Sequence, residues 1–245
     1  MSLPLTIENL RAGWGETIVL HDVSFSIPAG GVLALLGRNG VGKSTLLHAL
    51  MGSCRFLGGR ILVGDEDITR LPPQRRARKG LGFVPQEREI FPSLTVDENL
   101  AIARRDGGWS AERIYALFPS LAERRRNYGD RLSGGEQQML AIGRALGGAP
   151  KALLLDEPME GLAPIVVDKL YDALAAIRAE DKPTIVLVEQ KVDLALAFAE
   201  DAIVFDRGVV VHRGPTSALV ADENAKARLF GVAQAGARHG VESER

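Results

Sequence analysis

The chain has 245 residues, 46% hydrophobic and 25% charged, which is enough apolar material for one large α/β domain with or without a sub-domain. Its 30 lysines and arginines nearly balance 31 aspartates and glutamates, which argues against a nucleic-acid partner, because such partners need a basic excess or patch. The single cysteine, Cys54, excludes an internal disulfide and is interpreted as a small filler residue in a reducing compartment.

Neither a membrane span nor a signal peptide is apparent. No run approaches the roughly 20 apolar residues that a spanning helix needs. Residues 1–10 lack the positive start and apolar run of a signal peptide. We therefore expect a soluble, cytoplasmic protein whose membrane-spanning partners, if it serves a membrane process, are other chains.

The first predicted strands alternate apolar and polar residues. Residues 5–10 and 23–27 show this pattern, which is typical of half-exposed strands, so we expect an antiparallel layer at the edge of the fold. Four later runs are apolar throughout and are bounded by Gly, Pro or acidic residues, as in a parallel sheet that helices cover on both faces. These runs are residues 32–36, 152–155, 184–188 and 202–205.

Helix signals replace strand signals between residues 94 and 150. Thr95 and Ser133 each precede a glutamate by three positions, as in a capping box, and Ser110 can cap a further helix. We expect one domain over residues 1–232, with a helical sub-domain at about 90–150 inserted in the α/β core. A polar tail is expected at 233–245.

A glycine-rich motif follows the apolar run at 32–36. Residues 37–44, GRNGVGKS, match the phosphate-loop pattern Gly-x4-Gly-Lys-Ser/Thr and lead into a helical run. The glycines let backbone N–H groups face a phosphate, and the helix N-terminus adds partial positive charge. Lys43 is expected to reach the β- and γ-phosphates of ATP, and the Ser44 hydroxyl to bind Mg²⁺. The predicted nucleotide ligands here are Gly37, Asn39, Gly40, Gly42, Lys43, Ser44 and Thr45.

Two acidic residues end the apolar run at 152–155. Such a pair is more often a solvated loop, but beside a phosphate loop it predicts a hydrolytic centre. Asp156 would hold a water of the Mg²⁺ shell, and Glu157 would polarise the attacking water as general base.

The segment Ser133-Gly134-Gly135 begins a predicted helix. A capping box by itself explains Ser133, but two glycines weaken a helix start unless a ligand must approach the backbone closely. A helix N-terminus with free N–H groups and a hydroxyl is an anion site. A chain this short has no use for two such sites on one nucleotide, so we expect a dimer in which each Ser133 helix covers ATP bound by the partner.

Together these motifs resemble those of the ATP-binding-cassette (ABC) ATPases over about residues 3–232. The resemblance implies an α/β P-loop NTPase with a parallel core sheet, an antiparallel β edge layer and an inserted helical sub-domain. It also implies Mg-ATP hydrolysis that drives transport, with a second ABC ATPase of the same or another chain, two transmembrane permease subunits and, indirectly, a solute-binding protein. Such ATPases lie on the cytoplasmic face of the inner or plasma membrane.

Several single residues acquire roles only through this resemblance. Trp14 matches an aromatic that stacks on adenine, although a partly exposed aromatic is the simpler alternative. Gln86 matches a glutamine that contacts Mg²⁺ and links the nucleotide site to the membrane partner. Gln190 stands where most members have His; an amide can orient water but does not exchange a proton, so Glu157 must be the base. Ala163 replaces an Asp that many relatives carry at the dimer interface.

Three segments narrow the resemblance to one importer class. Residues 135–146, 156–164 and 187–190 are similar to the smaller ATPase subunit of branched-chain amino-acid importers, and to the urea importer ATPase. Import rather than export depends on this similarity alone. Two other ABC classes stay open: a soluble ATPase acting on nucleic acid or ribosomes, and a scaffold for cofactor assembly. The first usually has two cassettes, a long coiled-coil insertion or zinc-binding cysteines, which this chain lacks.

Overall fold

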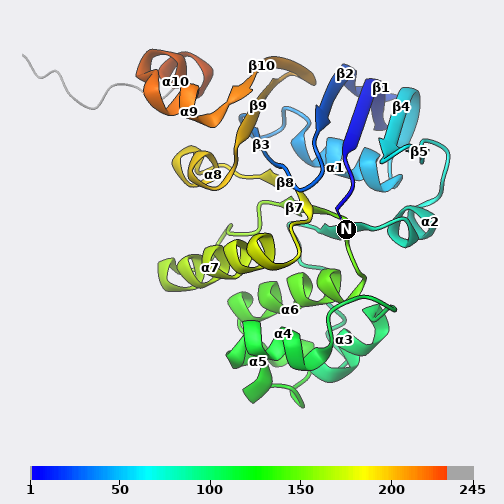
Figure 1. Ribbon diagram of the computed structural model, residues 1–245, viewed down its shortest axis with the longest axis vertical. Coiled ribbons are helices and arrows are strands. Elements are labelled where there is room, and N and C mark those ends of the chain that lie inside the picture. The colour runs from blue at the N-terminus through cyan, green and yellow to red at the C-terminus, as the bar shows by residue number, and fades with distance from the viewer. Residues whose placement is uncertain (1, 231–245) are drawn as a thin grey trace, which may run out of the picture.

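The computed structural model describes residues 2–230 and consists of two sheets and a helical region (Figure 1). The tail predicted at 233–245 lies outside the described residues. Within them, no helix combines the length and the hydropathy that crossing a membrane requires.

The antiparallel sheet has the strand order β2-β1-β4-β5. The predicted strands at 5–10 and 23–27 lie in β1 and β2, which pair with Leu5 opposite Ile27. Buried residues alternate with more exposed ones along parts of β1 and β2, with breaks at irregularities in the pairing, so one face of this sheet packs on the core. The strands are β1 (Leu5–Trp14), β2 (Thr17–Ile27), β4 (Arg55–Val63) and β5 (Glu66–Asp67).

The second sheet has the order β10-β9-β3-β8-β7-β6 and is parallel except for its edge strand β10. Every residue of β3, β7 and β8 is buried, which explains their unbroken apolar runs. The strands are β3 (Val32–Leu36), β6 (Leu81–Val84), β7 (Ala152–Asp156), β8 (Thr184–Val188), β9 (Asp201–Asp206) and β10 (Val209–Pro215).

The parallel sheet divides the apolar interior into two cores. Successive residues of a strand point to opposite faces. In β3, Val32 and Ala34 belong to the core shared with α6 (Gly134–Gly147) and α7 (Pro164–Glu180), whereas Leu33 and Leu35 belong to the core shared with α1 (Lys43–Met51) and the antiparallel sheet. The α/β P-loop NTPase architecture predicted from sequence, with its antiparallel edge layer, is therefore present.

The chain between β6 and β7 is helical. Both capping boxes are formed, and the Ser110 hydroxyl accepts a hydrogen bond from the Arg113 N–H. Figure 1 shows these helices gathered at one end of the molecule, beyond α7 and away from the antiparallel sheet. They are α3 (Val96–Ala103), α4 (Ala111–Leu117), α5 (Pro119–Glu123) and α6 (Gly134–Gly147), with a 3₁₀ turn at Gly129–Arg131.

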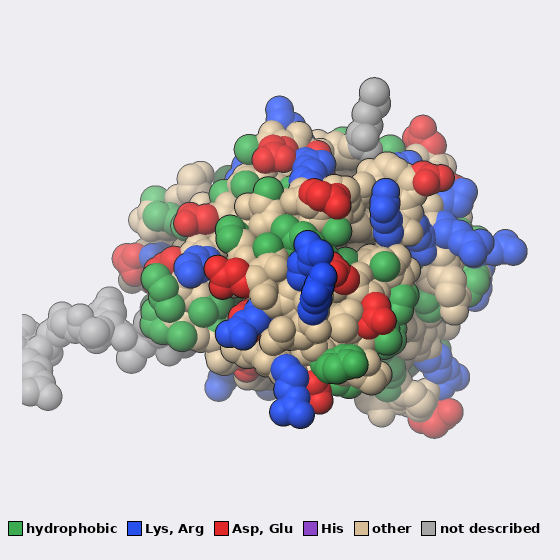
Figure 2. All heavy atoms as spheres, turned by 90° about the horizontal axis from the view of Figure 1, so that it is seen from below, with side chains coloured by type: hydrophobic (Ala, Val, Ile, Leu, Met, Phe, Trp, Pro, Cys, Tyr) green, Lys and Arg blue, Asp and Glu red, His purple; other side chains and the backbone are tan. Residues whose placement is uncertain are grey.

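The remaining helices flank the sheets. The helix α1 follows the phosphate loop, and α7 is the longest helix, with 17 residues. They are α1 (Lys43–Met51), α2 (Pro73–Arg78), α7 (Pro164–Glu180), α8 (Val192–Phe198), α9 (Thr216–Ala221) and α10 (Glu223–Phe230). Figure 2 shows cationic and acidic side chains interspersed over most of the face it draws, with cationic side chains gathered at its right edge.

Candidate active site

A cleft of about 390 Å³ lies where the carboxyl ends of the parallel strands meet. The loops after β3, β6, β7 and β8 all reach this edge, the usual place for ligands in open α/β sheets. The cleft brings together predicted residues that are up to 151 positions apart in sequence (Asn39 to Gln190). Its lining is Val19, Asn39, Gly40, Gly42, Lys43, Ser44, Thr45, Gln86, Glu157, Glu160 and Gln190. Val19 and Glu160 were not predicted.

The phosphate loop has a backbone that requires glycine at two positions. Gly42 has φ +111°, in the left-handed region, and its carbonyl accepts the Leu46 N–H at 3.0 Å as α1 begins. A Cβ on Gly37 would lie 2.5 Å from the carbonyl oxygen of Phe205. The loop is therefore held in its curved shape by neighbouring strands as well as by its own sequence.

The Lys43 ammonium lies inside this loop and is only 4% exposed. It donates to the carbonyl oxygens of Gly37, at 2.9 Å, and Arg38, at 3.0 Å. Its Nζ is also 3.6 Å from Oε1 of Glu157. These contacts hold the positive charge of Lys43 in the cleft before a nucleotide binds.

Asp156 lies at the end of β7 with 2% of its surface exposed. Burial raises its pKa to about 6, although a hydrogen bond with Ser44 and the charge of Lys43 act in the opposite direction. Its Oδ1 is buried and has no hydrogen-bond partner among the described residues. A buried carboxylate oxygen without a partner, beside a hydroxyl, is what a bound cation would complete.

The residues around Asp156 fit Mg²⁺ rather than a metal held by protein alone. Residues 2–230 contain no group of three or more His, Cys, Asp or Glu side chains that could hold a metal. Mg²⁺ is usually bound by one or two carboxylates together with substrate phosphates and water. One carboxylate, the Ser44 hydroxyl and the Gln86 amide satisfy this pattern beside a phosphate loop.

Glu157 follows Asp156 with φ +45°, an uncommon conformation for a non-glycine residue. Its N–H donates to the Val188 carbonyl at 3.0 Å, which ties the turn to β8. The Gln190 amide donates to its Oε2. Burial raises the Glu157 pKa, and the nearby Glu160 acts in the same direction, whereas Gln190 and Lys43 lower it. The carboxylate is thereby oriented toward the phosphate loop.

Trp14, at the end of β1, lies beside the cleft and is 44% exposed. Its Nε1–H donates to the Thr45 hydroxyl at 3.2 Å. Its ring meets the His48 ring edge-on with centroids 5.3 Å apart, and His48 in turn meets Phe83 at 5.4 Å. An exposed, supported aromatic face is suitable for stacking on a base.

The Ser133 helix N-terminus does not line this cleft. Ser133 is exposed, and its hydroxyl and backbone are occupied by the capping box with Glu136. A Cβ on Gly135 would lie 2.7 Å from a methyl of Val166, so α6–α7 packing alone requires that glycine. The two predicted anion-binding segments are therefore separate within one chain.

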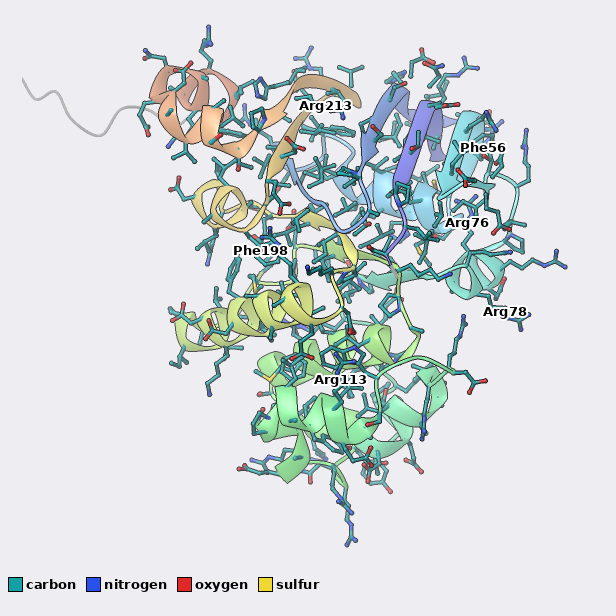
Figure 3. The ribbon with its side chains drawn as sticks, in the orientation of Figure 1. Phe56, Arg76, Arg78, Arg113, Phe198 and Arg213 are labelled. Atoms are coloured by element: carbon teal, nitrogen blue, oxygen red, sulfur yellow. The ribbon has the colours of Figure 1, made fainter. Side chains whose placement is uncertain are left out.

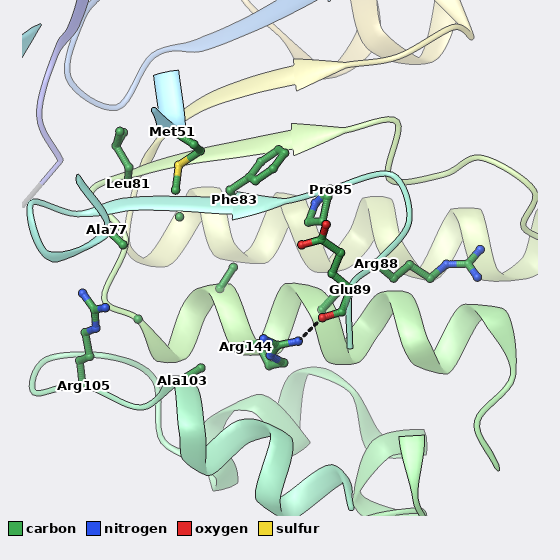
Figure 4. Close-up of a pocket in the computed structure, with 14 residues that line it drawn as sticks. Met51, Ala77, Leu81, Phe83, Pro85, Arg88, Glu89, Ala103, Arg105 and Arg144 are labelled. Atoms are coloured by element: carbon green, nitrogen blue, oxygen red, sulfur yellow. Dashed lines mark hydrogen bonds between the residues drawn. The ribbon is translucent and has the colours of Figure 1, made fainter. Parts of the chain in front are cut away.

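A second groove, of about 290 Å³, lies between β6, α2 and α6 (Figure 4). The segment 85–89, which carries Gln86, forms one side, and the guanidinium of Arg144 on α6 donates to the Glu89 carbonyl at 2.6 Å. The segment 85–89 therefore borders both the groove and, through Gln86, the nucleotide cleft.

Comparison with known proteins agrees with this geometry. Residues 20–160 match the ABC transporter family. The chain is 39% identical to the high-affinity branched-chain amino acid transport ATP-binding protein BraG of Pseudomonas aeruginosa, covering 93% of this chain and 99% of BraG. It is 36% identical to a probable branched-chain amino acid transport ATP-binding protein, LivF, of Archaeoglobus fulgidus, over 91% and 97% of the two chains. Identity to the lipopolysaccharide export ATP-binding protein LptB of Escherichia coli is 34%, over 93% and 97%.

Solved structures show the same fold. A dimeric ATP-binding cassette in a post-hydrolysis state with ADP and phosphate superposes with a TM-score of 0.75 and 26% identity, covering 86% of this chain and 98% of the cassette. The phosphate loop, the paired acids at the end of β7 and the capped Ser133 helix occur here in that architecture. The chain therefore belongs to the ABC transporter family, as an ATP-binding protein with ATPase activity.

Proposed function

We propose that this chain hydrolyses Mg-ATP in the cleft as the ATPase of an importer, with branched-chain amino acids as the transported solutes. The single observation that carries the hydrolytic assignment is the meeting of Lys43, Asp156 and Glu157 at one sheet edge, with an unpartnered Asp156 oxygen among the described residues. The solute assignment is supported by the similarity to BraG and LivF.

The residues predicted from the sequence have distinct tasks in this proposal. The backbone of Gly37, Asn39, Gly40 and Gly42, together with Thr45, holds the phosphates, and Lys43 neutralises the β- and γ-phosphates. Ser44, Asp156 and Gln86 hold Mg²⁺, which when bound offsets phosphate charge. Trp14 stacks on the adenine.

Hydrolysis itself needs a base and an oriented water. The Glu157 carboxylate takes a proton from the water that attacks the γ-phosphate. Gln190 holds this carboxylate by its amide and does not take up the proton itself. Burial of Glu157 favours the protonated product of that step.

A second copy completes the site. Ser133, Gly134 and Gly135 lie outside the cleft of their own chain, and the capping box does not use the N–H groups of Gly134 and Gly135, so this helix N-terminus can bind the nucleotide of a partner ATPase. We infer a head-to-tail dimer, of two identical chains or with another ABC ATPase, that ATP closes and hydrolysis reopens.

The groove beside Gln86 is suited to the membrane partner. It lies between α6 and the core and adjoins the nucleotide cleft, so a contact there is moved when the cleft closes. We infer that two permease subunits dock at such grooves on the cytoplasmic face, and that a solute-binding protein acts indirectly through them. The sequence similarity to an export ATPase, LptB, makes export the competing assignment.

Glu157→Gln tests the mechanism. The variant should bind Mg-ATP, lose at least about 100-fold in turnover and accumulate as a closed dimer, because the base is lost while the phosphate contacts remain. Dimerisation is measured by light scattering with Mg-ATP, and Lys43→Ala serves as the control that fails to bind. Wild-type turnover by Glu157→Gln would refute Glu157 as base.

Uptake of labelled leucine by vesicles containing the reconstituted transporter tests the solute, and absence of uptake would remove that assignment.

A further inference from the structure

Glu160 is a cleft residue for which the hydrolytic scheme has no use. It lies in the loop between β7 and α7, is exposed to solvent and lines the cleft. The Gln86 amide, on the loop after β6, donates a hydrogen bond to its Oε2. One side chain therefore joins two loops across the mouth of the cleft.

The negative charge of Glu160 disfavours the binding of a nucleotide in the cleft. Among the cleft-lining side chains the only cation is Lys43, whereas Glu157 and Glu160 are both acidic. A third acid, Asp156, is hydrogen-bonded to the cleft residue Ser44. Glu160 is close enough to Glu157 to share a hydrogen bond with it. A triphosphate that enters here meets a like charge at Glu160, which opposes binding.

The Gln86 amide is also needed elsewhere once nucleotide is present. If Gln86 contacts Mg²⁺, as its place in the cleft supports, its side chain is released from Glu160. The loop that carries Gln86 leads directly into the helical region that begins with α3, and its residues 85, 88 and 89 also line the groove beside α6. Glu160 therefore competes with Mg-nucleotide for the Gln86 side chain, which belongs to the loop that borders both the cleft and the groove.

We propose that Glu160 is a positioning residue that holds Gln86 in the nucleotide-free cleft and gives it up when Mg-ATP binds. The inference rests on the proposed function, since it presupposes nucleotide in this cleft. Glu160 restrains the Gln86 loop while the cleft is empty. Nucleotide binding and movement of this loop are thereby coupled through one charged hydrogen bond.

The test is the binding of a fluorescent, non-hydrolysable ATP analogue to the full chain, measured with Mg²⁺ and again with EDTA. Glu160→Ala should lower the Kd about tenfold with Mg²⁺, when the charged hydrogen bond to Gln86 and one like charge no longer oppose binding, and less than about threefold in EDTA, where only the like charge matters. In a Gln86→Ala background the same change should lower the Kd less than about threefold, since the contact is already gone. Glu123→Ala, which removes an exposed charge in α5, should leave the Kd unchanged.

A merely structural role would weaken binding, so the direction of the change separates the two interpretations. Weaker binding by Glu160→Ala, or an equal effect in both Gln86 backgrounds, overturns the inference. If the wild-type chain does not bind the analogue with Mg²⁺, or if Lys43→Ala binds it equally well, the proposed function fails instead. If the wild type binds and Lys43→Ala does not, an unchanged Kd for Glu160→Ala removes this inference alone.

Discussion

Asp156 occupies a position that favours its neutral form, although its proposed role needs a charge. Burial in β7 raises its pKa to about 6 from 3.8, and its Oδ1 has no partner among the described residues. Holding an ionised carboxylate there without a cation costs free energy of folding. The ionised Asp156 carboxylate therefore lowers the free energy of unfolding of the protein when no cation is bound.

Asp156→Asn should therefore stabilise the metal-free chain in a pH-dependent way. The folded pKa lies above the unfolded one, so the wild type loses stability as pH rises from about 4 through about 6, by about 3 kcal/mol at most. Asp156→Asn lacks this loss. The difference in free energy of unfolding between the variant and the wild type should therefore be near zero at pH 4 and reach its full value at pH 8. Urea unfolding in EDTA at the two pH values measures it. An equal difference at both would contradict the assigned burial cost.

At the scale of elements, α1 and α2 are joined by a single buried arginine. Arg76 is 2% exposed and donates to the carbonyls of Leu71, Thr69, Ala49 and Leu50 at 2.7–2.8 Å. No carboxylate pairs with it among residues 2–230. The last two carbonyls belong to the C-terminal turn of α1, where a cation is favoured by the helix dipole. The helix that carries Lys43 is therefore supported at its far end.

Arg76→Met should destabilise the chain by about 3 kcal/mol, because the carbonyls are left buried without donors. Figure 3 shows Arg76 beside α1 and Arg78 on the outer side of α2, so Arg78→Met is a matched control that should change stability by less than about 0.5 kcal/mol. Denaturant midpoints give both values. Equal effects of the two substitutions would show that the four hydrogen bonds do not matter.

Elements differed in how well the sequence predicted them. The helices α3, α4 and α6 begin at their predicted caps because Thr95, Ser110 and Ser133 act within one turn. The strand β4 was not predicted, since Arg55–Val63 contains two glycines and buries only two residues completely. It is a strand because β1 supplies its hydrogen bonds, with Thr6 opposite Leu62.

At the scale of the whole molecule, the helical region is tied to the core at the C-terminal end of α7. Arg113 on α4 pairs with Glu180 at 2.7 Å and with Asp181 at 2.9 Å, at the end of α7. Its guanidinium lies 3.6 Å from the centre of the Trp109 ring, and the Trp109 N–H donates to Asp181. This cluster limits how far the helical region can turn against α7.

Arg113→Ala should loosen that region by about 1 kcal/mol, because partly exposed ion pairs are weak individually but here act with ring stacking. Hydrogen–deuterium exchange of α4 should rise several-fold, while nucleotide affinity stays unchanged. Arg126→Ala, an exposed arginine of the same region, should leave exchange unaltered. Unchanged exchange in Arg113→Ala would show that the cluster does not hold the region.

The sequence by itself determined the features that depend on neighbours in the chain: the phosphate loop, the acids after an apolar strand, the capped helices and the buried strands of the parallel sheet. Spacing and periodicity encode these features directly, because each is made by a few consecutive residues. Only the tertiary structure decided that Gln86 meets Glu160 and that Trp109 meets Asp181. The physical reason is that such contacts join residues dozens of positions apart, so they depend on strand order and on loop conformations that no local pattern specifies.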